Sequence, residues 1–316
     1  MLSYRHGFHA GMHADVLKHV VLVHLLRYLT QKDKPLWFID THAGAAAYAL
    51  DEGYATKNAE YESGIARLWA REDLPKPVAD YVEQVRALNP DGQLRRYPGS
   101  PQLAMQVLRK QDRLRMFELH STESQLLQQY FRGDGPRAMV QAGDGFAGLQ
   151  SVLPPPSRRA LVLIDPSYED KGDYRRVLVA LRDAQKRFRA GVYAIWYPQV
   201  QRRESRQFPE QLKQLQDQDW LHVTLTVKKP VTGGLGLHGS GMFILNPPWL
   251  LPKALDIAMP YLRRFWRRMP LQVSASNSNS RENPRLDHMV RRERAGMAFV
   301  AGFDLYRCVS DGESLA

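Results

Sequence analysis

Short apolar runs alternate with stretches of helical periodicity along most of this chain, and this alternation restricts the possible folds more than any other feature. Each apolar run is too short for a buried helix, and longer amphipathic stretches separate most of the runs. The pattern is typical of an α/β fold, a doubly wound sheet in which helices connect parallel strands. We expect strands at 36–39, 114–119, 138–142, 160–164 and 192–196, and helices at 14–29, 122–131, 173–188 and 204–216.

The last third of the chain departs from this alternation. Residues 221–227 and 242–245 are both apolar, and the stretch between them includes the glycine-rich segment 232–241 but no helical pattern. Strands without an intervening helix pair antiparallel, so we expect these two at one edge of the sheet. A final helix is predicted over 251–267.

Two segments stand apart from the sheet pattern. Amphipathic stretches at 57–71 and 75–88 predict two helices inserted after the first strand, and Ser100-Pro101 predicts the start of the next helix, with serine as its N-cap. Residues 274–284 are polar and of low complexity, which predicts a linker or disorder, with a short helix at 289–299. The expected division is 1–45 for the N-terminal helix and first strand, 46–97 for an inserted helical subdomain, 98–270 for the remainder of the main domain, and 271–316 for a polar, partly disordered extension.

The charge balance favours a polyanionic partner. The 316 residues include 44 Lys and Arg against 33 Asp and Glu, which gives a net charge of +11 and a pI near 9.7. Arginine dominates and suits phosphate contacts, although an ordinary basic enzyme has a similar balance. No apolar run approaches the roughly 18 residues of a membrane span, and the first residues lack a signal peptide's apolar region. Because Cys308 is the only cysteine, internal disulfides and multi-thiolate zinc sites are excluded. We expect a cytoplasmic monomer without metal or membrane contact.

Four of the predicted strands end in an acidic residue: Asp40, Glu118, Asp144 and Asp165. The carboxyl ends of parallel strands meet at one edge of the sheet, and ligands bind there at the point where the strand order reverses. A single acid at a strand end can act simply as a helix cap. Four in succession predict a ligand site.

The first strand end favours a cofactor with a nucleoside and no phosphates. Asp40-Thr41-His42-Ala43-Gly44 is a tight turn of small residues, but the three alanines after Gly44 exclude a glycine-rich phosphate cradle. S-adenosylmethionine is the commonest cofactor of this kind. Glu118 would accept the ribose hydroxyls, and Asp144 would meet the adenine amine with Phe146 beside the ring. The inserted helices explain why Glu118 follows Gly44 by 74 residues rather than about 20.

Asp165-Pro166-Ser167-Tyr168 is the predicted catalytic loop. Pro166 keeps Asp165 out of the helical conformation and has no N–H, so the loop offers the Asp165 carboxylate and the Pro166 carbonyl as acceptors. Tyr168 would supply a flat surface for a base. Two acceptors beside an aromatic ring suit the amine of a stacked adenine, because they aim its lone pair at a methyl sulfonium while Asp165 takes a proton. The alternative is a structural turn with a capping acid and a packed tyrosine.

A second motif, Asn246-Pro247-Pro248-Trp249, is similar to one that amine methyltransferases often carry. It follows the strand predicted at 242–245, away from the point where the strand order reverses. We therefore expect its prolines to end an edge strand and precede the last helix, with no catalytic role.

Aromatic and imidazole side chains crowd the N-terminal region, which contains Tyr4, Arg5 and four histidines: His6, His9, His13 and His19. No carboxylate or cysteine completes a standard metal-ligand spacing, so we expect no metal site. Rings interleaved with Arg5 suit stacking on unpaired bases and contact with phosphate, and Lys18 is also placed to meet a phosphate. His19 faces either the cofactor pocket or the core.

These motifs together resemble the RlmJ family of 23S ribosomal RNA adenine-N6 methyltransferases, over roughly residues 1–270. The resemblance lies in Ser3-Tyr4-Arg5-His6, the stretch His13–His19, Asp40–Gly44, Pro98-Gly99-Ser100-Pro101 and Ile164–Glu169. It implies a Rossmann-like class I methyltransferase with S-adenosylmethionine as methyl donor. The implied substrate is adenine 2030 of free 23S rRNA rather than of the assembled subunit.

The resemblance also assigns roles to individual residues. His19, His42, Ser100, Glu118, Asp144 and Gly145 would bind the cofactor, Asp165 would be the catalytic acceptor within Asp165-Pro166-Ser167-Tyr168, and Tyr4 would contact RNA, with Arg5, His6 and Lys18 as further RNA-binding candidates. Ser167 replaces the second proline of the family's motif, and Met12 stands where the family has Asn. The alternatives are a DNA adenine-N6 methyltransferase and a non-catalytic nucleic-acid-binding protein linked to DNA use.

Overall fold

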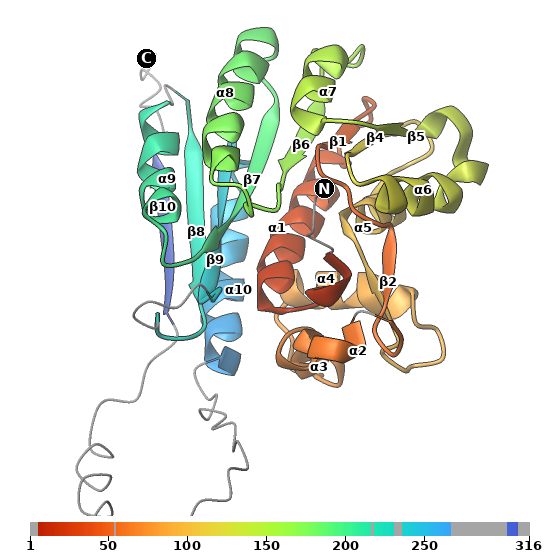
Figure 1. Ribbon diagram of the computed structural model, residues 1–316, viewed down its shortest axis with the longest axis vertical. Coiled ribbons are helices and arrows are strands. Elements are labelled where there is room, and N and C mark those ends of the chain that lie inside the picture. The colour runs from red at the N-terminus through yellow and green to blue at the C-terminus, as the bar shows by residue number, and fades with distance from the viewer. Residues whose placement is uncertain (1–5, 54, 216–217, 231–235, 267–301, 309–316) are drawn as a thin grey trace, which may run out of the picture.

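The computed structural model describes residues 6–53, 55–215, 218–230, 236–266 and 302–308 (Figure 1). One eight-stranded sheet organises the chain, in the order β10-β8-β9-β7-β6-β1-β4-β5. Its strands are β1 (Trp37–Asp40), β4 (Arg113–Glu118), β5 (Ala138–Ala142), β6 (Ala160–Ile164), β7 (Val192–Gln199), β8 (Trp220–Thr226), β9 (Gly239–Leu245) and β10 (Gly302–Cys308).

The sheet is mostly parallel, as the alternating pattern predicts. β1, β4, β5, β6 and β7 run in one direction, while β9 pairs antiparallel with both β7 and β8. The predicted antiparallel pairing of the two late strands is therefore confirmed. β10 lies outside β8 and forms the edge of the sheet, so the boundary expected at residue 270 separates this strand from the sheet to which it pairs. The short helix expected at 289–299 lies outside the described residues.

Helices cover both faces of the sheet (Figure 1). Side chains of β6 alternate between two cores: Leu161 and Leu163 face one, and Val162 and Ile164 face the other. This alternation is what a strand with two covered faces requires. The first core includes residues of α1 (His13–Leu29), α5 (Ser100–Val107), α6 (Ser121–Tyr130) and α10 (Leu251–Trp266), and the second includes residues of α7 (Gly145–Val152), α8 (Gly172–Arg187) and α9 (Arg203–Gln214).

The insertion adds a further layer outside α1. Val16 and Leu17 of α1 share one core with Tyr81 and Val85 of α4 (Lys76–Ala87), so α1 is covered by the sheet on one side and by the insertion on the other. A helix covered in this way is apolar nearly all round. The insertion starts and ends in a small antiparallel sheet of β2 (Ala47–Ala49) and β3 (Arg96–Pro98).

The helix predicted at 57–71 is divided into three short pieces: α2 (Ala55–Asn58), the 3₁₀ turn Glu60–Ser63 and α3 (Ala66–Trp69). One break falls at Ala59, which has a left-handed φ of +47°. The other falls at Gly64, whose position would bring a Cβ within 1.9 Å of the Gly11 carbonyl oxygen. The close backbone approach explains this second break, because only glycine fits there. Two further 3₁₀ turns span His6–Phe8 and Arg132–Arg137.

Candidate active site

A cavity of about 370 Å³ opens at the carboxyl ends of β1, β4, β5 and β6, which is where the strand order of the sheet reverses. The loops that follow these strands line it together with the N-terminal half of α1. All seven residues predicted to hold the cofactor lie in its wall, namely His19, His42, Ser100, Glu118, Asp144, Gly145 and Asp165.

The wall of this cavity is acidic in a protein that is strongly basic overall. Seven carboxylates line it (Asp15, Glu118, Glu123, Asp144, Asp165, Asp170 and Asp173), against two side chains with a fixed positive charge, Lys18 and Arg176. Such a wall favours a ligand that carries positive charge and disfavours a polyphosphate.

The turn after β1 is fixed by Glu118, at the end of β4. Gly44 has a left-handed φ of +59°, and its N–H donates to one Glu118 carboxylate oxygen at 2.7 Å. The His120 N–H donates to the other oxygen, also at 2.7 Å. Burial raises the pKa of Glu118, although these two bonds oppose that effect. Each oxygen keeps a further lone pair, so the carboxylate can still accept hydrogen bonds from a ligand.

Asp40 and Ser100 form a buried pair under the cavity. The Ser100 hydroxyl donates to Asp40 at 2.6 Å, and the His42 N–H donates to the other oxygen at 3.3 Å. The predicted N-cap role of Ser100 is therefore wrong: Gly99 is the N-cap of α5, and Ser100 is the first helical residue. Burial raises the pKa of Asp40 to about 7.

The end of β5 leads directly into α7. The Asp144 carboxylate caps this helix by accepting the Phe146 N–H at 2.8 Å, and Phe146 lies edge-on to His42 at 4.8 Å. Gly145 is required here because a Cβ would come within 1.8 Å of the Thr41 carbonyl oxygen. Burial lowers the pKa of His42 to about 4, so its imidazole is neutral at pH 7.

His19 contributes a neutral imidazole from α1. Its Nδ1 is bonded to the Tyr97 hydroxyl at 2.7 Å, and the Tyr97 hydroxyl is bonded in turn to that of Tyr81 at 2.9 Å. Burial lowers the pKa of His19 to about 3. Its Nε2 is buried and has no hydrogen-bond partner among the described residues, which leaves that atom for a ligand in the cavity.

Asp165 lies next to Lys18 in the wall of the cavity. The Lys18 ammonium is 2.6 Å from an Asp165 carboxylate oxygen and 3.0 Å from one of Asp15. Asp15 is also hydrogen-bonded to the His6 imidazole at 3.0 Å and accepts a hydrogen bond from the Gly11 N–H at 2.9 Å. The predicted phosphate contact of Lys18 is therefore wrong in this structure, because two carboxylates hold its ammonium and the side chain is buried.

Tyr168 does not offer a surface to the cavity, and this corrects the expectation that its ring carries a base. Its side chain is 2% exposed, its hydroxyl donates to the Trp196 carbonyl at 2.7 Å, and its ring packs on Tyr174. Its φ of +55° is unusual for a bulky residue. Arg202 holds this conformation by donating to the Tyr168 carbonyl at 3.0 Å. Tyr168 is thus an anchor behind the loop, whereas Pro166 and Trp196 line the cavity.

The predicted RNA-binding residues are only partly described. His6 lines the cavity, and Tyr4 and Arg5 lie outside the described residues. Asp15 and Trp196 were missed by sequence reasoning. Asp15 could have been predicted, because a carboxylate three residues before a lysine on the same helix lies next to that lysine. Among the described residues, no cluster of three or more His, Cys, Asp or Glu side chains is arranged to hold a metal, and no helix is long and apolar enough to cross a membrane.

Asn246 lies far from this cavity. Because β9 runs antiparallel to β7, its last residue, Leu245, pairs with Tyr193 near the start of β7, at the opposite edge of the sheet. The Asn246 amide donates to the carbonyls of Arg189 and Gly191 at 2.8 and 2.7 Å. The expectation that this motif is structural agrees with its position.

The model of one protein family, described as ribosomal RNA large subunit methyltransferase D, RlmJ, matches residues 33–270. The chain belongs to the RlmJ family. It is therefore a methyltransferase, with the class I fold that the sequence predicts. The strand β10 lies beyond the matched residues.

Individual proteins also match most of the chain. A protein of Escherichia coli K12 named ribosomal RNA large subunit methyltransferase J is 45% identical over 262 residues, covering 83% of this chain and 93% of that protein. Its namesake in Haemophilus influenzae Rd is 43% identical over 265 residues, covering 84% and 94%. A crystal structure of a Legionella pneumophila protein shares 32% identity with a TM-score of 0.79, covering 96% of this chain and 99% of that one.

Proposed function

We propose that this chain transfers a methyl group from S-adenosylmethionine to N6 of an adenine in 23S ribosomal RNA. The observation that carries the proposal is that Asp165 and Pro166 line the same cavity as Glu118, so amine acceptors and a ribose acceptor share one space. The names of the relatives support the RNA class of the substrate.

The residues of the cavity fit S-adenosylmethionine. Glu118 has acceptor capacity for the two ribose hydroxyls, and the Asp144 carboxylate, which follows β5 and lines the cavity, would accept a hydrogen bond from the adenine amine. The buried Nε2 of His19 has no partner among the described residues and would serve the amino acid end. The acidic wall favours the sulfonium and ammonium charges. When bound, this cofactor supplies an electrophilic methyl group.

Asp165 and Pro166 act on the target amine. The Asp165 oxygen that does not contact Lys18, together with the Pro166 carbonyl, would accept the two N6 protons and orient the nitrogen lone pair. Methylation makes N6 cationic, and one of its protons then passes to the Asp165 carboxylate. Burial raises the pKa of Asp165 and so makes it a better proton acceptor, while the Lys18 ammonium opposes this shift.

Trp196 takes the stacking role that the sequence assigned to Tyr168. It lines the cavity from β7, and its backbone carbonyl is bonded to the Tyr168 hydroxyl. The Lys18 ammonium lies 5.8 Å from the centre of the Trp196 ring. A base stacked on this ring would place its amine near Asp165, and the adenosine must leave its helix to reach it.

The test is methyl transfer from labelled S-adenosylmethionine to three substrates: protein-free 23S rRNA, assembled 50S subunits and duplex DNA. The proposal expects label on free rRNA, at adenine N6 after digestion, and much less on the other two. Label on DNA alone would support the DNA methyltransferase alternative. RNA binding with no transfer to any substrate would support a non-catalytic protein.

A further inference from the structure

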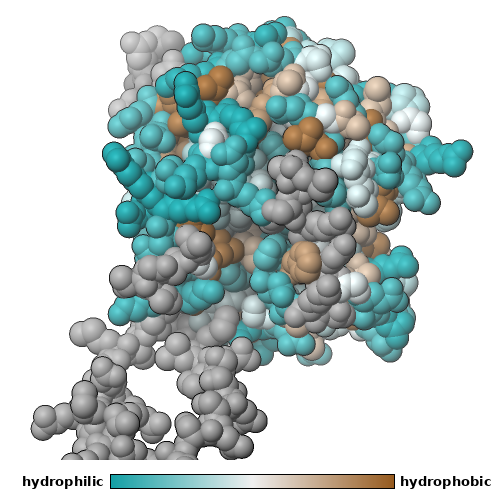
Figure 2. Space-filling model, viewed as in Figure 1, coloured by the Kyte–Doolittle hydropathy of each residue, from teal (hydrophilic) through white to brown (hydrophobic). Residues whose placement is uncertain are grey.

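The positive charge of this protein is distributed unevenly over the fold. Residues 171–230 hold 13 Lys and Arg against six Asp and Glu, whereas the insertion, residues 46–97, holds seven against nine. Figure 2 shows strongly hydrophilic side chains projecting from the side of the molecule that carries α8 and α9. The insertion therefore contributes nothing to the net positive charge, and the region after β6 contributes most of it.

The basic side chains of the insertion are largely engaged within the protein. Arg71 pairs with Asp73 at 2.6 Å, Lys76 with Asp80 at 2.8 Å and Arg95 with Asp91 at 3.3 Å. Arg67 and Arg86 donate to backbone carbonyls at 2.8 Å. Charges neutralised in this way add little attraction for a polyanion.

Four basic side chains in the segments after β6, β7 and β8 differ in this respect. Lys171, Arg203, Lys228 and Lys229, which we call the basic rim, are exposed and pair with no carboxylate in the part of the chain that the structure describes. Of the four, Arg203 contacts the neutral Gln207. Exposed cations without a carboxylate partner repel one another, so a group of them favours an anionic partner.

The basic rim follows the carboxyl ends of three strands of the sheet. Its members lie after β6, β7 and β8, and these strands run in the same direction, so their carboxyl ends share the edge at which the cavity opens. Three strand spacings separate β6 from β8, about 14 Å in total. A nucleic-acid strand carries about one phosphate per 3.4 Å of duplex axis, so this distance covers several phosphates.

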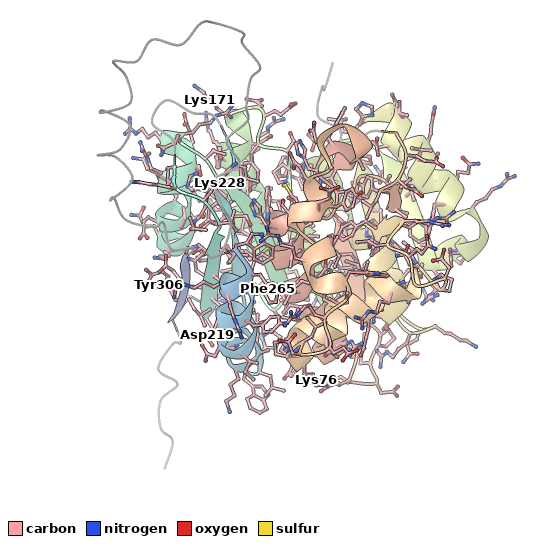
Figure 3. The ribbon with its side chains drawn as sticks, turned by 90° about the horizontal axis from the view of Figure 1, so that it is seen from below. Lys76, Lys171, Asp219, Lys228, Phe265 and Tyr306 are labelled. Atoms are coloured by element: carbon pink, nitrogen blue, oxygen red, sulfur yellow. The ribbon has the colours of Figure 1, made fainter. Side chains whose placement is uncertain are left out.

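Contacts of neighbouring residues connect the basic rim to the cavity. Arg202, next to Arg203, donates to the carbonyls of Tyr168 and Glu169 in the catalytic loop. At the other end, the Lys228 N–H donates to the His238 carbonyl at 3.2 Å, and the His238 N–H donates to the carbonyl of Gln199, the last residue of β7, at 3.0 Å. Figure 3 places Lys171 and Lys228 toward one end of the molecule and Lys76 of the insertion toward the other.

We propose that the basic rim binds the phosphates of the RNA strand that flanks the target adenosine, and that the insertion does not. This inference rests on the proposed function and names where its substrate is held. Taking an adenosine out of its stack costs a few kcal/mol, and phosphate contacts beside the cavity offset that cost without touching the reacting groups.

The experiment compares two double variants with the unmodified protein. K228Q/K229Q removes two charges of the basic rim. The control K32Q/K34Q removes two exposed lysine charges that precede β1, at the amino ends of the parallel strands. Affinity for an rRNA hairpin that carries the target adenine is measured at several salt concentrations, together with cofactor affinity and kcat at saturating RNA.

The inference expects K228Q/K229Q to weaken RNA binding about tenfold and to reduce the slope of log affinity against log salt by roughly 1.5, as for two lost phosphate contacts. Cofactor affinity and kcat stay within about twofold, and K32Q/K34Q behaves like the unmodified protein. Equal RNA affinity and slope in K228Q/K229Q, or equal losses in both variants, would overturn it. The inference would also be overturned if K228Q/K229Q lost more affinity for phosphatidylglycerol vesicles than for RNA. If the unmodified protein methylates no rRNA, it is the proposed function that fails.

Discussion

The Lys18 ammonium lies 2.6 Å from a carboxylate oxygen of Asp165, although 147 positions separate the two residues in the sequence. Asp15, one helical turn before Lys18, holds the same ammonium from the other side at 3.0 Å. Burial alone would lower the pKa of Lys18, but the two carboxylates raise it, so the lysine stays charged. The pair fixes the position of Asp165, and Lys18 lowers the pKa of Asp165 against the effect of burial.

Lys18→Gln should shift the pH dependence of methyl transfer. Lys18 lowers the pKa of Asp165 against the opposing effect of burial, so its removal raises that pKa and ionisation then requires a higher pH. The acid limb of kcat/KM against pH is therefore expected to move to higher pH, with partial recovery in Lys18→Arg. An acid limb that does not move in a folded Lys18→Gln protein would contradict the claim that Lys18 lowers the pKa of Asp165.

Glu118→Gln should weaken cofactor binding more than it slows chemistry. Both Glu118 oxygens accept backbone N–H groups at 2.7 Å, and a glutamine amide nitrogen would face one of those donors without accepting its hydrogen bond. We expect cofactor affinity to fall by roughly tenfold or more, measured by calorimetry, because bonds to charged groups contribute about 1.5–3 kcal/mol. At saturating cofactor kcat should change little, and an unchanged affinity would contradict the ribose role of Glu118.

Asp40→Asn should stabilise the protein at alkaline pH. Burial raises the folded-state pKa of Asp40 from 3.8 to about 7, so the protonated form is favoured and stability is lost as pH rises between these values. An asparagine resembles the protonated acid and avoids this loss. The free energy of unfolding of Asp40→Asn should exceed that of the unmodified protein by up to about 4 kcal/mol at pH 8 and match it near pH 4. A difference that does not depend on pH would contradict the shift.

Asn246→Ala should cost stability and leave catalysis intact. The substitution removes two hydrogen bonds to backbone carbonyls and places alanine at a φ of +51°, for a loss of roughly 2–3 kcal/mol. Asn246→Gly tolerates that φ and should lose less. Denaturant unfolding measures both, and a kcat that falls more than about twofold in either folded variant would bring this motif back as a candidate site.

The sheet was largely predictable because its strands are continuous apolar runs between helical stretches. The bounds of β5 and β6 agree with the sequence pattern at every residue. β2 and β3 were missed because strands of three residues carry no measurable periodicity. The strand β10 was missed although it has seven residues, because it follows a long polar segment and Asp304 and Arg307 interrupt its apolar residues.

The candidate site was predictable where a residue's role depends on the strand end that carries it. Glu118, Asp144 and Asp165 line the cavity for this reason. The burial of Tyr168 was not predictable, because it depends on a positive φ and on packing against Phe208, 40 positions later in the chain. A sequence pattern shows neither of these.

The most direct test of the central claim is methyl transfer by Asp165→Asn to protein-free 23S rRNA, with cofactor affinity measured on the same sample. Asparagine keeps the shape of the side chain but cannot take the proton that N6 loses. The account predicts that kcat falls by a factor of about 100 or more, within the range for loss of a general base, while cofactor affinity stays within tenfold. Turnover within a few-fold of the unmodified enzyme, or turnover that falls only in proportion to cofactor occupancy, would contradict it.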